Sequence, residues 1–180
     1  MKNLIIIPSR LESSRLPNKP LADINGEPMI VHVFNRAREA NIANVIVAAG
    51  NIEIKEAIEN VGGEAILTNP DHASGSDRIY EALTIYDKDS SYDNVINLQG
   101  DLPNIQKDAL IKIVSLLDSG NSDISTLGVK IFSDQEILNP NIVKVYVKNL
   151  SDNNIIDDFD RTFDLSKKDF LYHHIGIYGY

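Results

Sequence analysis

The sequence contains no cysteine among its 180 residues. Disulfide bridges, thiolate metal sites and cysteine nucleophiles are therefore excluded. No apolar run approaches the roughly 20 residues of a membrane-spanning helix, and the first residues lack the apolar core of a signal peptide. These absences favour a cytoplasmic protein without membrane insertion.

Positive charge is also scarce. The chain has 17 Lys and Arg residues against 26 Asp and Glu residues, giving a net charge of −9. Nucleic-acid surfaces need clustered cations to neutralise phosphates, so this balance argues against a nucleic-acid partner. The composition, 43% hydrophobic and 24% charged, is ordinary for a globular protein, and the length predicts one domain.

The few cations are concentrated near the N-terminus. The apolar run Leu4–Ile7 predicts a strand buried on both faces, and Pro8 is expected to end it because proline has no N–H to donate. Arg10, Arg15 and Lys19 follow. A loop after a central strand of a doubly wound fold faces the ligand crevice. Three cations in such a loop predict an anionic substrate. A solvated surface loop is the alternative, since neither a Walker pattern nor GxGxxG is present.

Apolar patterns of strand and helix alternate through most of the chain, which predicts an α/β fold with a largely parallel sheet and right-handed crossovers. Lys144 lies on the polar side of its strand's alternation and is expected to be solvated. Residues 151–168 show no clear period. The expected helices cover residues 29–40, 53–60, 74–86 and 109–117, and the expected strands cover residues 45–48, 64–67, 93–98, 124–129, 142–147 and 172–180.

Two further polar segments follow predicted strands. Ser74, Gly75 and Asp77 suit either a simple helix cap or a helix N-terminus that meets a polar or anionic ligand. Asp101 follows the strand over 93–98, where a carboxylate can hold magnesium or serve as an ordinary turn residue.

Several segments resemble one family. PSRLESSRLPNKPL resembles the signature PARxxSTRLPxKPL of the CMP-Kdo synthetases, the 3-deoxy-manno-octulosonate cytidylyltransferases of lipopolysaccharide synthesis. DHASGSDR resembles their DHxSGTDR, INLQGDLP their VNxQGDEP, and NPNIVKV their PNxVKV. The last residues, HHIGIYGY, resemble HxGIYAYR.

The resemblance implies a three-layer, Rossmann-like nucleotidyltransferase fold that transfers CMP from CTP to Kdo and releases pyrophosphate. Catalysis would depend on Arg10, Lys19 and Asp101, with Asp101 holding Mg²⁺. Nucleotide binding would fall to Arg10, Ser13, Arg15, Lys19, Ser74, Gly75 and Arg78. Sugar binding would fall to Gln99, Arg161, His174 and Tyr178.

The sequence departs from the family pattern in places. Ala49-Gly50-Asn51 replaces an Ala-Thr-Asp-like turn, Leu102 replaces a glutamate, and IDDFDRTFD replaces ALYFSRxPIP. A cytidylyltransferase for another acidic sugar, such as a sialic acid, therefore remains an alternative.

The chain also stops inside the family's HxGIYAYR motif. We expect residues 1–180 to form a single nucleotidyltransferase domain that lacks the family's C-terminal tail. A catalytically inactive nucleotide-binding remnant is therefore a further alternative. The resemblance implies a homodimer for the full-length form.

Overall fold

A computed structural model describes residues 1–12, 16–120, 122–148 and 155–180. These residues fall into two compact units. The first comprises Met1–Ser125 and Ile177–Tyr180, and the second comprises Thr126–Gly176. The expectation of a single nucleotidyltransferase domain stays a prediction. No helix among the described residues is long and apolar enough to cross a membrane.

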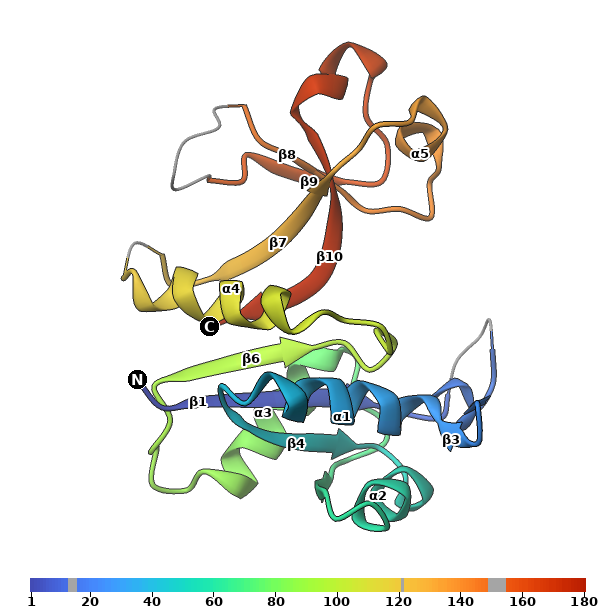
Figure 1. Ribbon diagram of the computed structural model, residues 1–180, viewed down its shortest axis with the longest axis vertical. Helices are drawn as coiled ribbons and strands as arrows, with labels where there is room; N and C mark the ends of the chain where they lie inside the picture. The colour runs from blue at the N-terminus through green and yellow to red at the C-terminus, as the bar shows by residue number, and fades with distance from the viewer. Residues whose placement is uncertain (13–15, 121, 149–154) are drawn as a thin grey trace. The chain divides into compact units, whose positions relative to one another are not determined.

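The first unit is built on a mostly parallel sheet in the order β5-β4-β1-β6, with the end of β10 antiparallel to β6. Figure 1 shows β6, β1 and β4 as arrows that run the same way. The strands of this sheet are β1 (Asn3–Ser9), β4 (Asn44–Ala49), β5 (Glu64–Leu67), β6 (Asn94–Leu98) and β10 (Leu171–Gly179).

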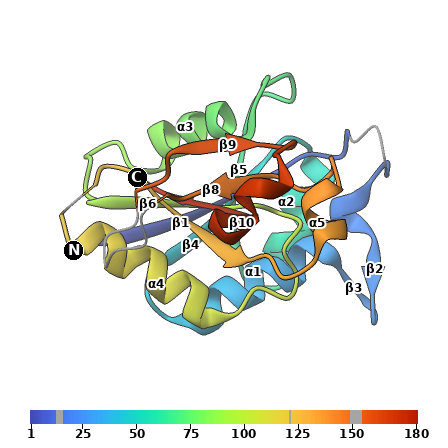
Figure 2. The same cartoon turned by 90° about the horizontal axis from the view of Figure 1, so that it is seen from above.

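Helices cover both faces of this sheet. On one face α1 contacts both α2 and α4, and on the other face α3 packs against β1, β4 and β5. In Figure 2 the strands lie between α3 on one side and α1 and α4 on the other. The helices are α1 (Met29–Ala40), α2 (Ile52–Glu59), α3 (Gly75–Tyr86) and α4 (Lys107–Asp118). The predicted α/β fold with a central, mostly parallel sheet is confirmed.

The core centres on β1. Leu4–Ile7 are completely buried, as the apolar run predicts. Leu4 and Ile6 pack against Ile79 and Ala82 of α3. Between the end of β1 and α1 lie the short helix η1 (Lys19–Leu21) and a small hairpin of β2 (Asp23–Ile24) and β3 (Glu27–Pro28).

The expectation that Pro8 ends the first strand is wrong. β1 continues through Pro8 and Ser9, which pair with Ala48 and Ala49 of β4. Successive residues of a parallel strand direct their backbone groups to opposite neighbours. The Ser9 carbonyl accepts from Gly50 N on the β4 side, so Pro8 faces the β6 side. Pairing with β6 has already ended at Ile6, so the ladder needs no N–H from Pro8.

The second unit is smaller and mainly antiparallel. β8 pairs with β9 on one edge and with the start of β10 on the other, and β7 also pairs with β10. Neither β9 nor the short helix η2 is predicted from the sequence. The elements are β7 (Ser125–Lys130), α5 (Asp134–Leu138), β8 (Lys144–Tyr146), β9 (Asp158–Asp160) and η2 (Leu165–Phe170).

The expectation of a solvated Lys144 is also wrong. Its side chain is completely buried, and Nζ donates to the carbonyls of Asn139 and Arg161, each at 2.5 Å. Alternation fails here because both faces of β8 are covered: the successive residues Lys144 and Val145 point to opposite faces, and both are buried. Burial lowers the pKa of the Lys144 ammonium, and the charge of Arg161 lowers it further. Lys144 therefore joins the ends of two loops in the second unit.

We expect Lys144→Ala to lower the free energy of unfolding by at least about 2 kcal/mol, because two loop carbonyls lose their donor and the buried stem is removed. Lys130→Ala is the control, since Lys130 is an exposed lysine of the same unit. Urea unfolding followed by circular dichroism measures both. Equal stability of the two variants would contradict the structural role of Lys144.

Candidate active site

Two adjoining cavities lie at the carboxyl ends of β1 and β6 in the first unit. Their volumes are about 240 and about 190 Å³. Both are lined by Pro8, Ser9, Arg10 and Gln99. The larger is completed by His72, Ala73, Ser74, Gly75 and Arg78, and the smaller by Lys19, Pro20, Met29, Gly100 and Asp101. The sheet therefore gathers three separate predicted segments at one edge, where open α/β sheets bind ligands.

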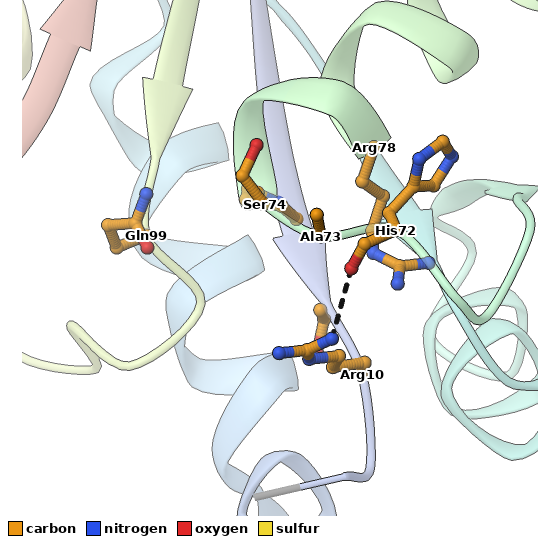
Figure 3. A pocket seen from close by; sticks show the side chains of 9 residues that line it. Arg10, His72, Ala73, Ser74, Arg78 and Gln99 are labelled. Carbon is orange, nitrogen blue, oxygen red and sulfur yellow. Dashed lines mark hydrogen bonds between the residues drawn. The ribbon is translucent and has the colours of Figure 1, made fainter.

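Two arginines line the larger cavity (Figure 3). Arg10 comes from the end of β1, and its Nη1 donates to the His72 carbonyl at 3.1 Å. Arg78 comes from the first turn of α3 and is 2% exposed. Burial lowers the pKa of Arg78, and the nearby charge of Arg10 lowers it further. Burial and a neighbouring cation both disfavour the charge of Arg78, so an anionic ligand would stabilise this site.

Arg78 also organises the loop between β5 and α3. Its guanidinium donates to Thr68 Oγ1 at 2.7 Å and to the carbonyls of Asn69 and Pro70, each at 3.0 Å. Gly50 allows this arrangement, since a Cβ there would lie 2.6 Å from Arg78 Nη1. The glycine that departs from the family pattern thus has a packing role. The predicted contact between Arg78 and the nucleotide stays a prediction.

Asn51 holds the start of the loop that follows β1 and carries Arg10 and Lys19. Its Oδ1 accepts from Leu11 N at 3.0 Å, and its Nδ2 donates to Glu12 Oε1 at 3.1 Å. A hydrogen bond from its own backbone and the one from Asn51 lower the pKa of Glu12. The second departure from the family's turn therefore holds the loop after Arg10, a role that sequence reasoning missed. The predicted residues Ser13 and Arg15 lie outside the described residues.

Ser74 caps α3, as predicted. Asp77 N donates to Ser74 Oγ at 3.2 Å, and Ser74 Oγ donates to Asp77 Oδ2 at 2.7 Å. A Cβ on Gly75 would lie 3.4 Å from Pro8 Cγ, so the start of α3 lies close to the end of β1. The cap and the cavity use the same residues, so the two sequence interpretations are compatible. Ligand binding by Ser74 and Gly75 stays a prediction.

Glu81 holds the loop that carries His72. Glu81 Oε2 accepts a short hydrogen bond from His72 Nε2 and another from Asn69 N at 2.9 Å. These two interactions lower the pKa of Glu81. The His72 ring is therefore bound to α3, while the His72 carbonyl is left to receive Arg10. Glu81 had no signal in the sequence motifs.

Lys19 and Asp101 form an ion pair in the smaller cavity, with Lys19 Nζ 2.8 Å from Asp101 Oδ2. Their side chains are 36% and 52% exposed, so both remain accessible to a ligand. No group of three or more His, Asp or Glu side chains suited to a metal occurs among the described residues. Mg²⁺ often binds through one carboxylate, waters and substrate phosphates, so Asp101 fits that kind of site.

Gln99 lines both cavities, and its Nε2 donates to Asn97 Oδ1 at 2.9 Å. Tyr178 pairs with Asn97 across β6 and β10, also in the first unit. Burial raises the pKa of the Tyr178 hydroxyl. The structure thus places two of the four predicted sugar-binding residues beside the same asparagine.

Arg161 and His174 belong to the second unit. Arg161 Nη1 donates to the carbonyls of Pro140 and Asn141, each at 3.2 Å. His174 Nε2 lies 2.9 Å from Thr126 Oγ1, and burial lowers the pKa of its imidazole. The sugar-binding role of both residues stays a prediction.

His174 and Tyr178 are four positions apart, so regular alternation along a strand predicts that they point to the same face, but the structure does not support this count. Gly176 lies between them with a φ of 74°, which is not an extended conformation. Strict alternation therefore cannot be counted across it.

Comparison with known proteins identifies the family. A family model described as "Cytidylyltransferase" matches residues 4–180. The chain belongs to the cytidylyltransferase family. Members of this family are transferases, so the expectation of an enzyme family is confirmed.

The similar proteins make the family likeness more specific. The chain is 47% identical to the 3-deoxy-manno-octulosonate cytidylyltransferase of Brucella ovis, covering 100% of this chain and 72% of that protein. It is 45% identical to the enzyme of the same name from Bartonella bacilliformis, covering 100% of this chain and 74% of that protein. The resemblance to the CMP-Kdo synthetases is confirmed.

Solved structures of cytidylyltransferases are also similar to this chain. A CMP:2-keto-3-deoxy-manno-octonic acid synthetase complexed with CTP matches with a TM-score of 0.86 and 38% identity, covering 100% of this chain and 74% of that one. The 4-diphosphocytidyl-2C-methyl-D-erythritol synthase of Anaerococcus prevotii has 14% identity and a TM-score of 0.63, which supports the fold alone.

We expect Arg78→Lys to lower the free energy of unfolding by about 2 kcal/mol, because a lysine cannot reproduce the three-bond fork to Thr68, Asn69 and Pro70. Arg36→Lys is the matched control: Arg36 lies on α1 in an exposed pair with Glu39, and a change within about 0.5 kcal/mol is expected. Urea unfolding compares the two. If Arg78→Lys is as mild as its control, the guanidinium does not organise the loop.

Proposed function

We propose that the chain transfers CMP from CTP to 3-deoxy-D-manno-octulosonate (Kdo), which gives CMP-Kdo and pyrophosphate for lipopolysaccharide biosynthesis. The observation that carries the proposal is the grouping of Arg10, Arg78, Lys19 and Asp101 around two adjoining cavities at the carboxyl ends of β1 and β6. Relatives named for this reaction and a similar synthetase solved with CTP support it.

In the proposed reaction the anomeric hydroxyl oxygen of the sugar bonds to the α-phosphorus of CTP. The bond from that phosphorus to the bridging oxygen breaks, pyrophosphate leaves, and the hydroxyl proton passes to solvent. Arg10 and Lys19 would hold the phosphates, with Arg15 and Ser13 of the same loop. They would also stabilise the charge that develops on the pyrophosphate. Catalysis of this kind depends on positioning and electrostatics and needs no covalent nucleophile.

Asp101 is the residue we propose for Mg²⁺. When bound, the ion would neutralise phosphate charge and lower the pKa of the acceptor hydroxyl. Lys19 would then exchange its ion pair with Asp101 for a phosphate oxygen. Ser74, Gly75 and Arg78 would contact the base and ribose, since they line the larger cavity.

Kdo is the acceptor in this proposal, and the residues proposed to bind it are Gln99, Tyr178, Arg161 and His174. The sequence differs from the family most in the segment that carries Arg161, which keeps another acidic sugar, such as a sialic acid, as the second candidate. The names of the relatives favour Kdo.

We also propose a cytoplasmic homodimer for the full-length protein. The second unit exposes large apolar side chains, including Phe132 at 89% and Leu138 at 63%. Exposed apolar side chains of this size are typical of protein interfaces. Light scattering of the full-length protein measures its mass, and a monomer at micromolar concentration would contradict the proposal.

The function is tested by pyrophosphate release from CTP and Mg²⁺ in parallel reactions with Kdo, with sialic acid and without sugar. Release that depends on Kdo supports the proposal. Release with sialic acid alone would reassign the acceptor. Silence with every acceptor, in a folded chain that binds CTP, would favour the inactive remnant.

Lys19→Ala should lower turnover by about 100-fold or more, because it removes a cation that stabilises the leaving pyrophosphate. Lys55→Ala is the control, since Lys55 lies on α2 in an ion pair with Glu59 and lines neither cavity. Steady-state pyrophosphate release and thermal unfolding are measured for both. Near-normal turnover of Lys19→Ala would remove Lys19 from the phosphate site.

Asp101→Asn should abolish both turnover and its dependence on Mg²⁺, because a neutral amide is a much weaker ligand for this ion. A magnesium titration of pyrophosphate release measures this. Asp108→Asn, an exposed carboxylate in the first turn of α4, controls for the loss of one negative charge. Turnover of Asp101→Asn that still rises with Mg²⁺ would place the metal elsewhere.

A further inference from the structure

Asn97 is a buried polar residue near the carboxyl end of β6. It is 2% exposed, and its neighbours Ile96 and Leu98 are completely buried. Burying an amide without a hydrogen bond costs about 1–3 kcal/mol in proteins. An asparagine at this point of the core therefore needs a specific partner.

That partner is Gln99. Asn97 Oδ1 accepts from Gln99 Nε2 at 2.9 Å, and the two residues, separated by one position, emerge near the end of β6. The contact fixes which end of the Gln99 amide faces Asn97. Nε2 is turned toward Asn97, so Oε1 is directed elsewhere. Among the described residues, no hydrogen bond to Gln99 Oε1 is present, and Gln99 lines both cavities.

Asn97 also adjoins Tyr178, its cross-strand neighbour on β10. Directly opposed residues of antiparallel strands point to the same face of the sheet. Asn97 thus lies between the two residues of the first unit that are proposed to bind the sugar, although it lines neither cavity itself.

We propose that Asn97 is a positioning residue for the acceptor sugar. By engaging Nε2, it presents Gln99 Oε1 as a hydrogen-bond acceptor, so the site selects a substrate that offers a hydroxyl donor there. A freely turning amide would present either a donor or an acceptor. Sites built around one defined polarity discriminate strongly against analogues that cannot match it. This inference rests on the proposed function.

Asn97→Leu removes the acceptor and keeps the branched outline of the side chain. We expect KM for Kdo to rise about tenfold, which corresponds to about 1.4 kcal/mol, while KM for CTP changes less than about twofold. Asn94→Leu is the matched control. Asn94 is a second buried asparagine of β6, at the opposite end of the strand, where it donates to Asn3 and Asp118. This variant should lose stability without a selective rise in KM for Kdo.

A double-mutant cycle separates positioning from simple packing. Gln99→Ala should raise KM for Kdo, and adding Asn97→Leu to it should change KM no further than about twofold, because there is no longer an amide to orient. Fully additive effects, or an equal rise in KM for CTP in Asn97→Leu alone, would overturn the proposal.

A measurement without sugar keeps the inference separate from the proposed function. In the free wild-type chain, one of the two Gln99 side-chain amide protons should be protected from exchange with water, as measured by NMR. Gln99→Glu assigns the signals of these protons by removing them, and Asn97→Leu should remove the protection. Equal, rapid exchange of both amide protons in the wild type would overturn the role of Asn97. Protected signals in a chain that never uses Kdo would instead overturn only the acceptor assignment.

Discussion

Pairing on both edges and burial on both faces hold β1 in one position, and that position determines where the candidate site forms. The strand is hydrogen-bonded to β4 and β6 and lies between α3 and the helices of the opposite face. Its end brings Pro8, Ser9 and Arg10 beside Gln99, which follows β6. Because parallel strands end at one edge, segments about 90 residues apart in the chain share two cavities without a dedicated binding loop between them.

Charge in the site is arranged locally, against the balance of the whole chain. The net charge is −9, yet the pKa of Arg78 is lowered by burial and further by the nearby charge of Arg10. Both arginines donate to main-chain carbonyls: Arg10 Nη1 donates to His72, and Arg78 donates to Asn69 and Pro70. Carbonyls accept from the N–H groups but do not neutralise the positive charge. An anionic ligand would therefore still be stabilised beside the two arginines, which both line the larger cavity.

Sequence patterns predicted the first unit well, because its strands and helices each have a clear apolar period and its motifs stand at their ends. They failed where tertiary contacts decide. Pro8 continues its strand because its missing N–H faces an edge that is already unpaired, and Lys144 is buried because loop carbonyls supply its partners. Both outcomes depend on contacts with residues outside the local sequence pattern. Asn51, Glu81 and Asn97 were missed for a related reason: each acts on another residue of the site, so a ligand motif does not reveal it.

The two units differ in how the polar residues proposed to bind ligands are engaged within the fold. In the first, Gln99 keeps one amide oxygen available after its hydrogen bond to Asn97, and Lys19 and Asp101 can exchange their mutual contact for ligand contacts. In the second, Arg161 Nη1 donates to two loop carbonyls, and the Arg161 carbonyl accepts from Lys144 Nζ. Binding a sugar carboxylate through that Nη1 would therefore compete with contacts that hold the loop. Arg161, which is proposed to bind the acceptor, thus also maintains the fold of the second unit, whereas Lys19 and Asp101, which are proposed for phosphate and Mg²⁺, are held by one exposed ion pair.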